Sequence, residues 1–204
     1  GAVRHLAQLS NIPMPKVLNY KERRHQPFWD SLVRTTGNPA TALTTQTVLF
    51  GNANIGQRAL TNLQAAGQFV SDQTFVILAM RAYGFFRGTN AVRLYQETSV
   101  QLYFTLEVGD KPLFFAPTWY YPAGGGVDGF DATGANLNWG KPSHESILRL
   151  GRPIIVPPRQ GFRVIAEFFT VGTTNILTLI NTGATDDQKV ILFMLDGLHT
   201  RDVQ

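Results

Sequence analysis

Residues 146–169, with the sequence SILRLGRPIIVPPRQGFRVIAEFF, decide the fold of this chain. Residues 154–156 form a β-branched run between prolines, and proline marks strand ends because it has no N–H to donate to a ladder. A turn is predicted at residues 159–161. In the strand that follows, one face carries Phe162, Val164, Ala166 and Phe168, and the other carries Arg163, Ile165, Glu167 and Phe169. This alternation predicts a half-buried antiparallel strand with the first set facing the core.

The same signals recur along the chain and predict an all-β fold. Strand patterns occupy residues 73–86, 92–95, 99–108, 111–116, 154–156, 162–169, 175–181 and 189–199, and no long helix is expected between them. The Gly109-Asp110 pair predicts a hairpin turn between two of these strands. Eight antiparallel strands favour a sandwich or jelly roll. We therefore expect an eight-stranded antiparallel jelly-roll sandwich as a single domain over residues 51–204.

The N-terminal segment differs from this body in charge and pattern. Residues 1–34 hold six basic and two acidic residues, whereas residues 35–204 hold twelve of each, so the net charge of +4 belongs to the first segment. We expect residues 1–50 to form an extended basic arm, with a short helical turn near residues 28–32. Such an arm would contact neighbouring subunits, nucleic acid or an internal membrane. Its candidate contact residues are Arg4, Lys16, Lys21, Arg23, Arg24, Phe28, Trp29 and Arg34.

The composition points to buried contacts between molecules. Only 16% of the residues are charged, while the chain has 14 Phe, 6 Tyr and 3 Trp residues. Interface cores are rich in aromatic residues and poor in most charged ones. A large aromatic core within one molecule would give the same composition, and the sequence leaves both readings open.

Residues 117–146 are predicted to form a long loop, and long loops in compact domains are often functional. Its aromatic residues could form a contact surface or a platform on which sugars or bases stack. These candidates are Trp119, Tyr120, Tyr121, Phe130 and Trp139. Asp128 and Asp131 are weak calcium-ligand candidates because they do not match the EF-hand spacing, and turn chemistry is the simpler explanation for them.

Catalytic constellations are not visible in the sequence. The chain has no cysteine, which excludes thiol nucleophiles, zinc-thiolate sites and disulfides. Its four histidines do not stand at metal-ligand spacing, and no nucleophile elbow or P-loop is present. We therefore expect no enzymatic activity, no cofactor and no metal apart from the calcium candidate. A cupin-like metal enzyme is the alternative that metal analysis would test.

The lead-in and first strand, residues 60–77, together with the stretch at residues 153–164, resemble single jelly-roll capsid proteins of tailless icosahedral bacteriophages. The resemblance covers roughly residues 60–200 as a pattern of strands and turns. It implies a shell-building protein located in the virion, whose partners are copies of itself and other virion proteins. Many such relatives are double jelly rolls, and this chain is long enough for only one. A major, minor or vertex protein thus remains open, as does a carbohydrate- or receptor-binding module such as a spike.

Overall fold

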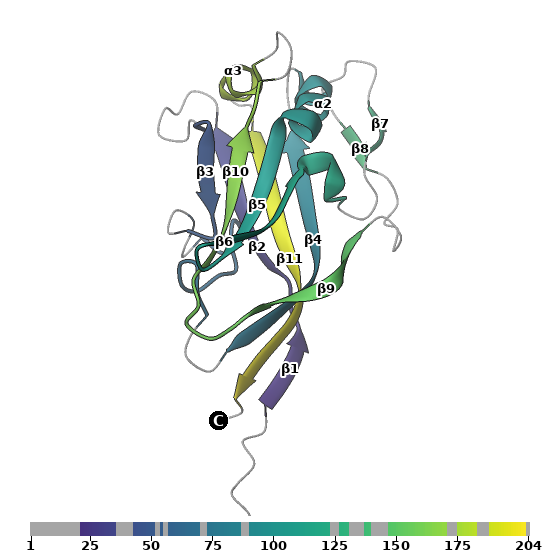
Figure 1. The fold of residues 1–204 in the computed structure, drawn as a ribbon. Coiled ribbons are helices and arrows are strands. Elements are labelled where there is room, and N and C mark those ends of the chain that lie inside the picture. Colours follow the sequence, from purple (N-terminus) through teal and green to yellow (C-terminus); the bar gives the residue numbers. More distant parts are fainter. Residues whose placement is uncertain are drawn as a thin grey trace, which may run out of the picture.

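A computed structural model describes residues 21–35, 43–51, 54, 57–69, 73–86, 90–122, 127–130, 137–139, 147–170, 175–182 and 188–202. The fold is mostly β, with all strand pairs antiparallel among the described residues, which confirms the all-β prediction. Two main sheets lie one in front of the other (Figure 1). They hold five and four strands, rather than the eight predicted in total.

The first sheet, called sheet A here, is built around the long C-terminal strand β11 (Gln188–Asp202). One edge of β11 pairs with β4 (Thr74–Phe86), which in turn pairs with β9 (Leu148–Val156). Its other edge pairs with two strands in succession: β2 (Phe28–Thr35) along residues 188–195 and β1 (Lys21–His25) along residues 198–202. The β11–β4 register shifts between Asp196 and Gly197. A side chain at Gly197 could not be accommodated, because a Cβ there would lie 2.0 Å from the Val76 carbonyl oxygen.

The second sheet, called sheet B, has the order β3-β10-β5-β6. Its strands are β3 (Gln46–Leu49), β10 (Phe162–Phe168), β5 (Leu102–Val108) and β6 (Lys111–Pro117). Strands β5 and β6 form the predicted hairpin, and Gly109 adopts the positive φ of 64° that its turn requires. The predicted turn before β10 is also present, with Arg159 at a φ of 59°.

Short elements connect the sheets. Helix α2 (Ala91–Gln101) leads into β5, the 3-10 turn η2 (Thr118–Tyr120) follows β6, and helix α3 (Ile176–Asn181) lies between β10 and β11. Among the described residues, strands β7 (Val127–Phe130) and β8 (Leu137–Trp139) pair with each other and with no other strand.

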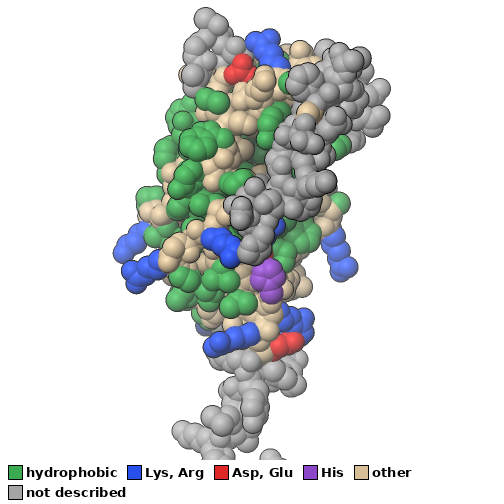
Figure 2. Space-filling model, turned by 90° about the vertical axis from the view of Figure 1, so that its right-hand side faces the viewer, with side chains coloured by type: hydrophobic (Ala, Val, Ile, Leu, Met, Phe, Trp, Pro, Cys, Tyr) green, Lys and Arg blue, Asp and Glu red, His purple; other side chains and the backbone are tan. Residues whose placement is uncertain are grey.

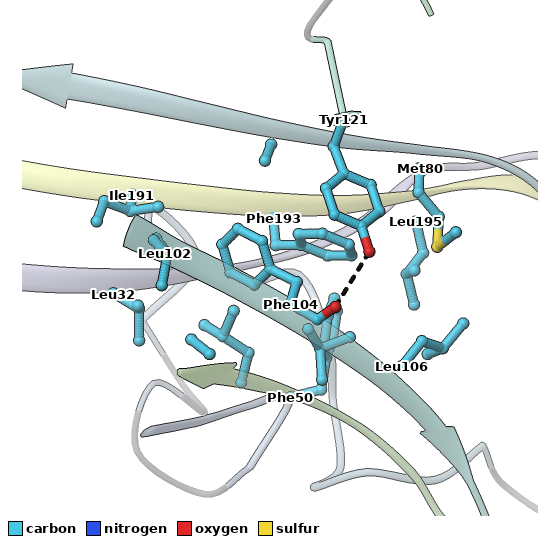
Figure 3. Close-up of a cluster of buried hydrophobic side chains, with 14 of the residues drawn as sticks. Leu32, Phe50, Met80, Leu102, Phe104, Leu106, Tyr121, Ile191, Phe193 and Leu195 are labelled. Atoms are coloured by element: carbon cyan, nitrogen blue, oxygen red, sulfur yellow. Dashed lines mark hydrogen bonds between the residues drawn. The ribbon is translucent and has the colours of Figure 1, made fainter. Parts of the chain in front are cut away.

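The hydrophobic core fills the space between the two sheets (Figure 3). Phe104 of sheet B meets Phe193 of sheet A with ring centroids 4.6 Å apart. Tyr121 is fully buried beside them, and its hydroxyl donates to the Phe104 carbonyl oxygen at 3.1 Å. The predicted inner face of β10 is confirmed, since its four residues are all buried: Phe162, Val164, Ala166 and Phe168.

Several predictions about local structure are wrong. Residues 92–95 and 99–101 belong to helix α2 rather than to strands, and residues 176–181 form helix α3. The helical turn expected near residues 28–32 is part of strand β2. Residues 117–146 are not one long loop, because they contain the end of β6, η2, β7 and β8. Residues 21–25 and 28–35 of the predicted arm are paired in sheet A and residues 46–49 in sheet B, so these parts belong to the sandwich, and residues 1–20 lie outside the described part of the chain.

Candidate interaction surfaces

The outer face of sheet B carries a row of side chains that crosses all four strands. Strand register places Val48 of β3, Ile165 of β10, Thr105 of β5 and Phe115 of β6 opposite one another in that order. Phe115 is 56% exposed and Val48 is also exposed, whereas Ile165 is only 8% exposed. Three of these four residues are nonpolar, which is unusual on the solvent side of an antiparallel sheet, where polar residues normally alternate with buried ones.

Aromatic rings extend this row toward one end of the sheet. Tyr103 stacks on Phe115 at 5.2 Å and meets the exposed ring of Phe169 edge-on at 5.1 Å. We call the residues Val48, Tyr103, Thr105, Phe115, Ile165 and Phe169 the outer apolar patch.

Charged and polar pairs border the outer apolar patch along the strands. At one end, Arg163 Nε donates to Glu107 Oε2 at 2.6 Å. At the other end, Gln46 Nε2 donates to Glu167 Oε1 at 3.3 Å. A nonpolar centre with a polar rim is the usual anatomy of a protein–protein interface.

Sheet A also has a largely nonpolar outer face. Register aligns Val33 of β2, Val190 of β11 and the exposed Phe85 of β4 in one row. Ile155 of β9, which is 59% exposed, lies on the same sheet. Figure 2 shows how hydrophobic side chains spread over one side of the molecule, with scattered Lys and Arg and few acidic side chains.

One buried acidic group interrupts this second face. Asp196, beside the register shift of β11, is 6% exposed and pairs with Arg81 of β4. His25 Nε2 of β1 lies 3.0 Å from the other carboxylate oxygen of Asp196. These contacts tie the end of β1 to the centre of sheet A.

The three aromatic residues at positions 119–121 differ in burial. Tyr121 belongs to the core, and burial raises the pKa of its hydroxyl. Trp119, at 62% exposed, and the exposed Tyr120 remain available for contacts. Beside them is a cavity of about 140 Å³ between β4, α2 and η2, whose lining includes Tyr83, Tyr95, Trp119 and Tyr121.

A second cavity, of about 220 Å³, lies where β1 meets the end of β11. Its lining includes Arg24, Arg201 and His199. Burial lowers the pKa of His199, and the positive charges of Arg201 and Arg24 lower it further. Glu22 binds both arginines, through Arg24 Nε at 2.7 Å and Arg201 Nε at 2.8 Å, which lowers the pKa of Glu22 to about 2.

The predicted arm residues are not gathered on one arm. Arg23 and Arg24 are exposed on β1, as the prediction of a basic contact segment requires. In contrast, Phe28 is a core residue and Arg34 is buried, with its Nη2 donating to the Asn181 carbonyl oxygen at 3.1 Å. Trp29 is half-buried on β2. The contact role predicted for Phe28 and Arg34 is therefore wrong, because both side chains are buried within the subunit.

The positions of Arg4, Lys16 and Asp131 lie outside the described residues, as do the side chains of Lys21, Asp128, Phe130 and Trp139. Among the side chains that the structure does describe, His, Asp and Glu form no cluster of three that could hold a metal ion.

One buried acidic site escaped the sequence prediction. Asp30 of β2 is 2% exposed and accepts hydrogen bonds from the Ser31 and Phe50 backbone N–H groups and from Asn54 Nδ2. Burial raises the pKa of Asp30, and these hydrogen bonds oppose the rise. The available signal was a lone aspartate between the apolar residues Trp29 and Leu32.

No protein-family model matches this chain, and a search of curated proteins found no match. Within the described residues, no helix is both long and apolar enough to cross a membrane.

Proposed function

We propose that this chain is a structural protein of a virion, which self-associates into an icosahedral shell through a jelly-roll domain. One observation carries the proposal: both outer faces of the sandwich present nonpolar side chains that a monomer would leave in water. Exposed nonpolar patches of this kind are typical of protein–protein interaction sites.

Strand order supports the jelly-roll part of the proposal. In a jelly roll, eight strands form two four-stranded sheets through two Greek keys. Leaving β1 aside, the pairing orders here are β2-β11-β4-β9 and β3-β10-β5-β6, with four strands in each sheet. The strand β1 would then be an addition to the edge of the barrel-like core.

The sequence supports the shell through its resemblance to single jelly-roll capsid proteins and through its basic N-terminal segment. Residues 1–20 contain two Lys or Arg residues and no acidic residue. In the proposed shell, these residues contact neighbouring subunits, nucleic acid or an internal membrane, and other virion proteins join the assembly.

Electron microscopy combined with light scattering tests this proposal. The purified chain and a variant lacking residues 1–20 are compared at low and high salt. Regular shells or large symmetric rings are expected from the full chain. A compact monomer under every condition, with or without other virion proteins, would refute the shell.

A second candidate function is a carbohydrate- or receptor-binding module. The specific observation in its favour is the exposed Trp119 ring at the mouth of an aromatic-lined cavity. A glycan array compares the native chain with Trp119→Ala. Binding that disappears in the variant would favour this function, and an array without a binder would count against it.

A further inference from the structure

We propose that the outer apolar patch of sheet B is a twofold, face-to-face contact between two copies of this chain. The axis would run along the row formed by Val48, Ile165, Thr105 and Phe115, so that the exposed Val48 and Phe115 at the two ends of the row each meet their own copy. This inference specifies one contact of the proposed assembly and rests on self-association, but it does not require a shell.

The charge pattern of β10 indicates that a second copy of this chain binds the outer apolar patch. Arg163 and Glu167 lie on the outer face of this strand, two residues before and two residues after Ile165. A twofold axis through Ile165 and perpendicular to the strand brings Arg163 opposite the partner's Glu167, and Glu167 opposite the partner's Arg163. A symmetric dimer needs a self-complementary surface of this kind, in which residue i meets j and j meets i.

The other side chains of the patch fit the same arrangement. On β5, Glu107 and Tyr103 stand on either side of Thr105, so that the axis places the Glu107 carboxylate opposite the partner's Tyr103 hydroxyl. The exposed Phe115 ring meets its own copy at the β6 end of the row, and Val48 does so at the β3 end. Arg163 already binds Glu107 in the monomer, yet its side chain is 53% exposed and can donate to a second carboxylate.

The size of the patch predicts a weak dimer. Neighbouring strands lie about 4.8 Å apart and residues rise about 3.3 Å each, so a patch of four strands by six residues has a projected area of roughly 400 Å². Stable protein pairs bury about 800 Å² on each partner. The contact should therefore form at high protein concentration, and other contacts in an assembly would strengthen it.

Cross-linking tests the geometry directly, because the native chain has no cysteine. The variant Phe115→Cys places one thiol on the proposed axis, and Ile155→Cys, exposed on sheet A, is the matched control. Packed sheets lie about 10 Å apart, which is too far for a disulfide, so a short bis-maleimide is used. We expect Phe115→Cys to form covalent dimers much faster than Ile155→Cys, and equal rates would overturn the proposal.

Charge reversal tests the orientation of the axis. The dimer constant is measured by sedimentation at several concentrations for Arg163→Glu, for Glu167→Arg and for the double variant. Each single reversal should weaken the dimer by about 3- to 30-fold, because each exposed charge pair occurs twice across the axis. The double reversal should restore it. An axis parallel to the strands would instead pair Arg163 with the partner's Glu107, and rescue by Arg163→Glu with Glu107→Arg would refute the proposed orientation.

The outcomes also separate this inference from the proposed function. Shells that assemble normally from Arg163→Glu would overturn the sheet B contact and leave the shell standing. Dimers that behave as predicted, without shells under any condition, would refute the shell and retain the contact. A monomer at all concentrations would overturn the dimer.

Discussion

Replacing Asp30 with asparagine tests how strongly the fold depends on one buried carboxylate. The side chain of Asp30 receives three hydrogen bonds: Ser31 N–H and Asn54 Nδ2 donate to Oδ1, at 2.9 and 2.7 Å, and Phe50 N–H donates to Oδ2. All three partners are donors, so the site suits a group that only accepts.

Asparagine has nearly the same shape but only one accepting oxygen. With its oxygen in the place of Oδ1, the amide keeps two hydrogen bonds and turns its NH₂ group toward the Phe50 N–H. One buried donor then loses its partner and a second donor faces it, which costs about 2–3 kcal/mol. For a chain of this length, that corresponds to a fall in Tm of roughly 5–10 °C.

Thermal and urea unfolding at pH 7 measure this change, with Asn54→Ala as the companion variant. Asn54→Ala removes one donor to Asp30 but leaves the carboxylate in place, and we expect it to cost about 1 kcal/mol. If Asp30→Asn is as stable as the native chain, the three hydrogen bonds do not offset the burial of the carboxylate, and the reasoning fails.

Three further changes test the fold. Phe162→Ala should cost about 3–5 kcal/mol, because the ring is buried and stacks on Phe69 at 5.1 Å, and an unchanged Tm would mean that its face is misassigned. The lowered pKa of His199 means that the unfolded chain binds a proton more readily than the native chain, so the free energy of unfolding should fall as the pH drops below 6.5. In urea titrations, His199→Phe should show a smaller fall over the same pH range. Parallel pH profiles of the native chain and the variant would contradict this. After deletion of residues 1–20, thermal unfolding followed by far-ultraviolet circular dichroism should remain cooperative. Deletion of residues 1–35 removes β1 and β2 and should abolish cooperative unfolding.

The strands that the sequence predicts well have one face made up of nonpolar residues. In β10, every second residue is nonpolar and buried, and the same period of two marks the inner side of β4. Strand β2 lacks this signal, because its inner face alternates nonpolar side chains with Asp30 and Arg34. Asp30 accepts hydrogen bonds from Phe50 and Asn54, and Arg34 Nη2 donates to the Asn181 carbonyl oxygen. These partners lie far away in the sequence, so a local pattern cannot reveal them.

The sequence patterns did not predict helices α2 and α3 for a related reason. The buried residues of α2 include Leu94, Thr98 and Gln101, so its inner stripe is partly polar and its β-branched residues favour a strand reading. Helix α3 is only six residues long, and its clearest signal was Asn175, whose side chain accepts from the Leu177 N–H at 2.9 Å as an N-cap.

The candidate surface was only partly predictable. The aromatic content pointed to either a core or an interface, and the structure contains both an aromatic core and exposed rings. The outer apolar patch depends on which residues of four strands stand opposite one another. Phe115, for example, lies in β6, where both faces are nonpolar, and only its register with Thr105 and Ile165 reveals the row.

The pairing of β1 with the end of β11 has a practical consequence for protein engineering. Lys21 lies opposite Asp202, so the first and last described residues are neighbours at one pole of the sandwich (Figure 1). A short linker could join them, as circular permutation requires, and new ends could be opened at the exposed turn after Val108. A fluorescent label carried at the new ends would then report on the β5–β6 turn, and one at the original pole would report on the β1–β11 end, without a substitution in either sheet.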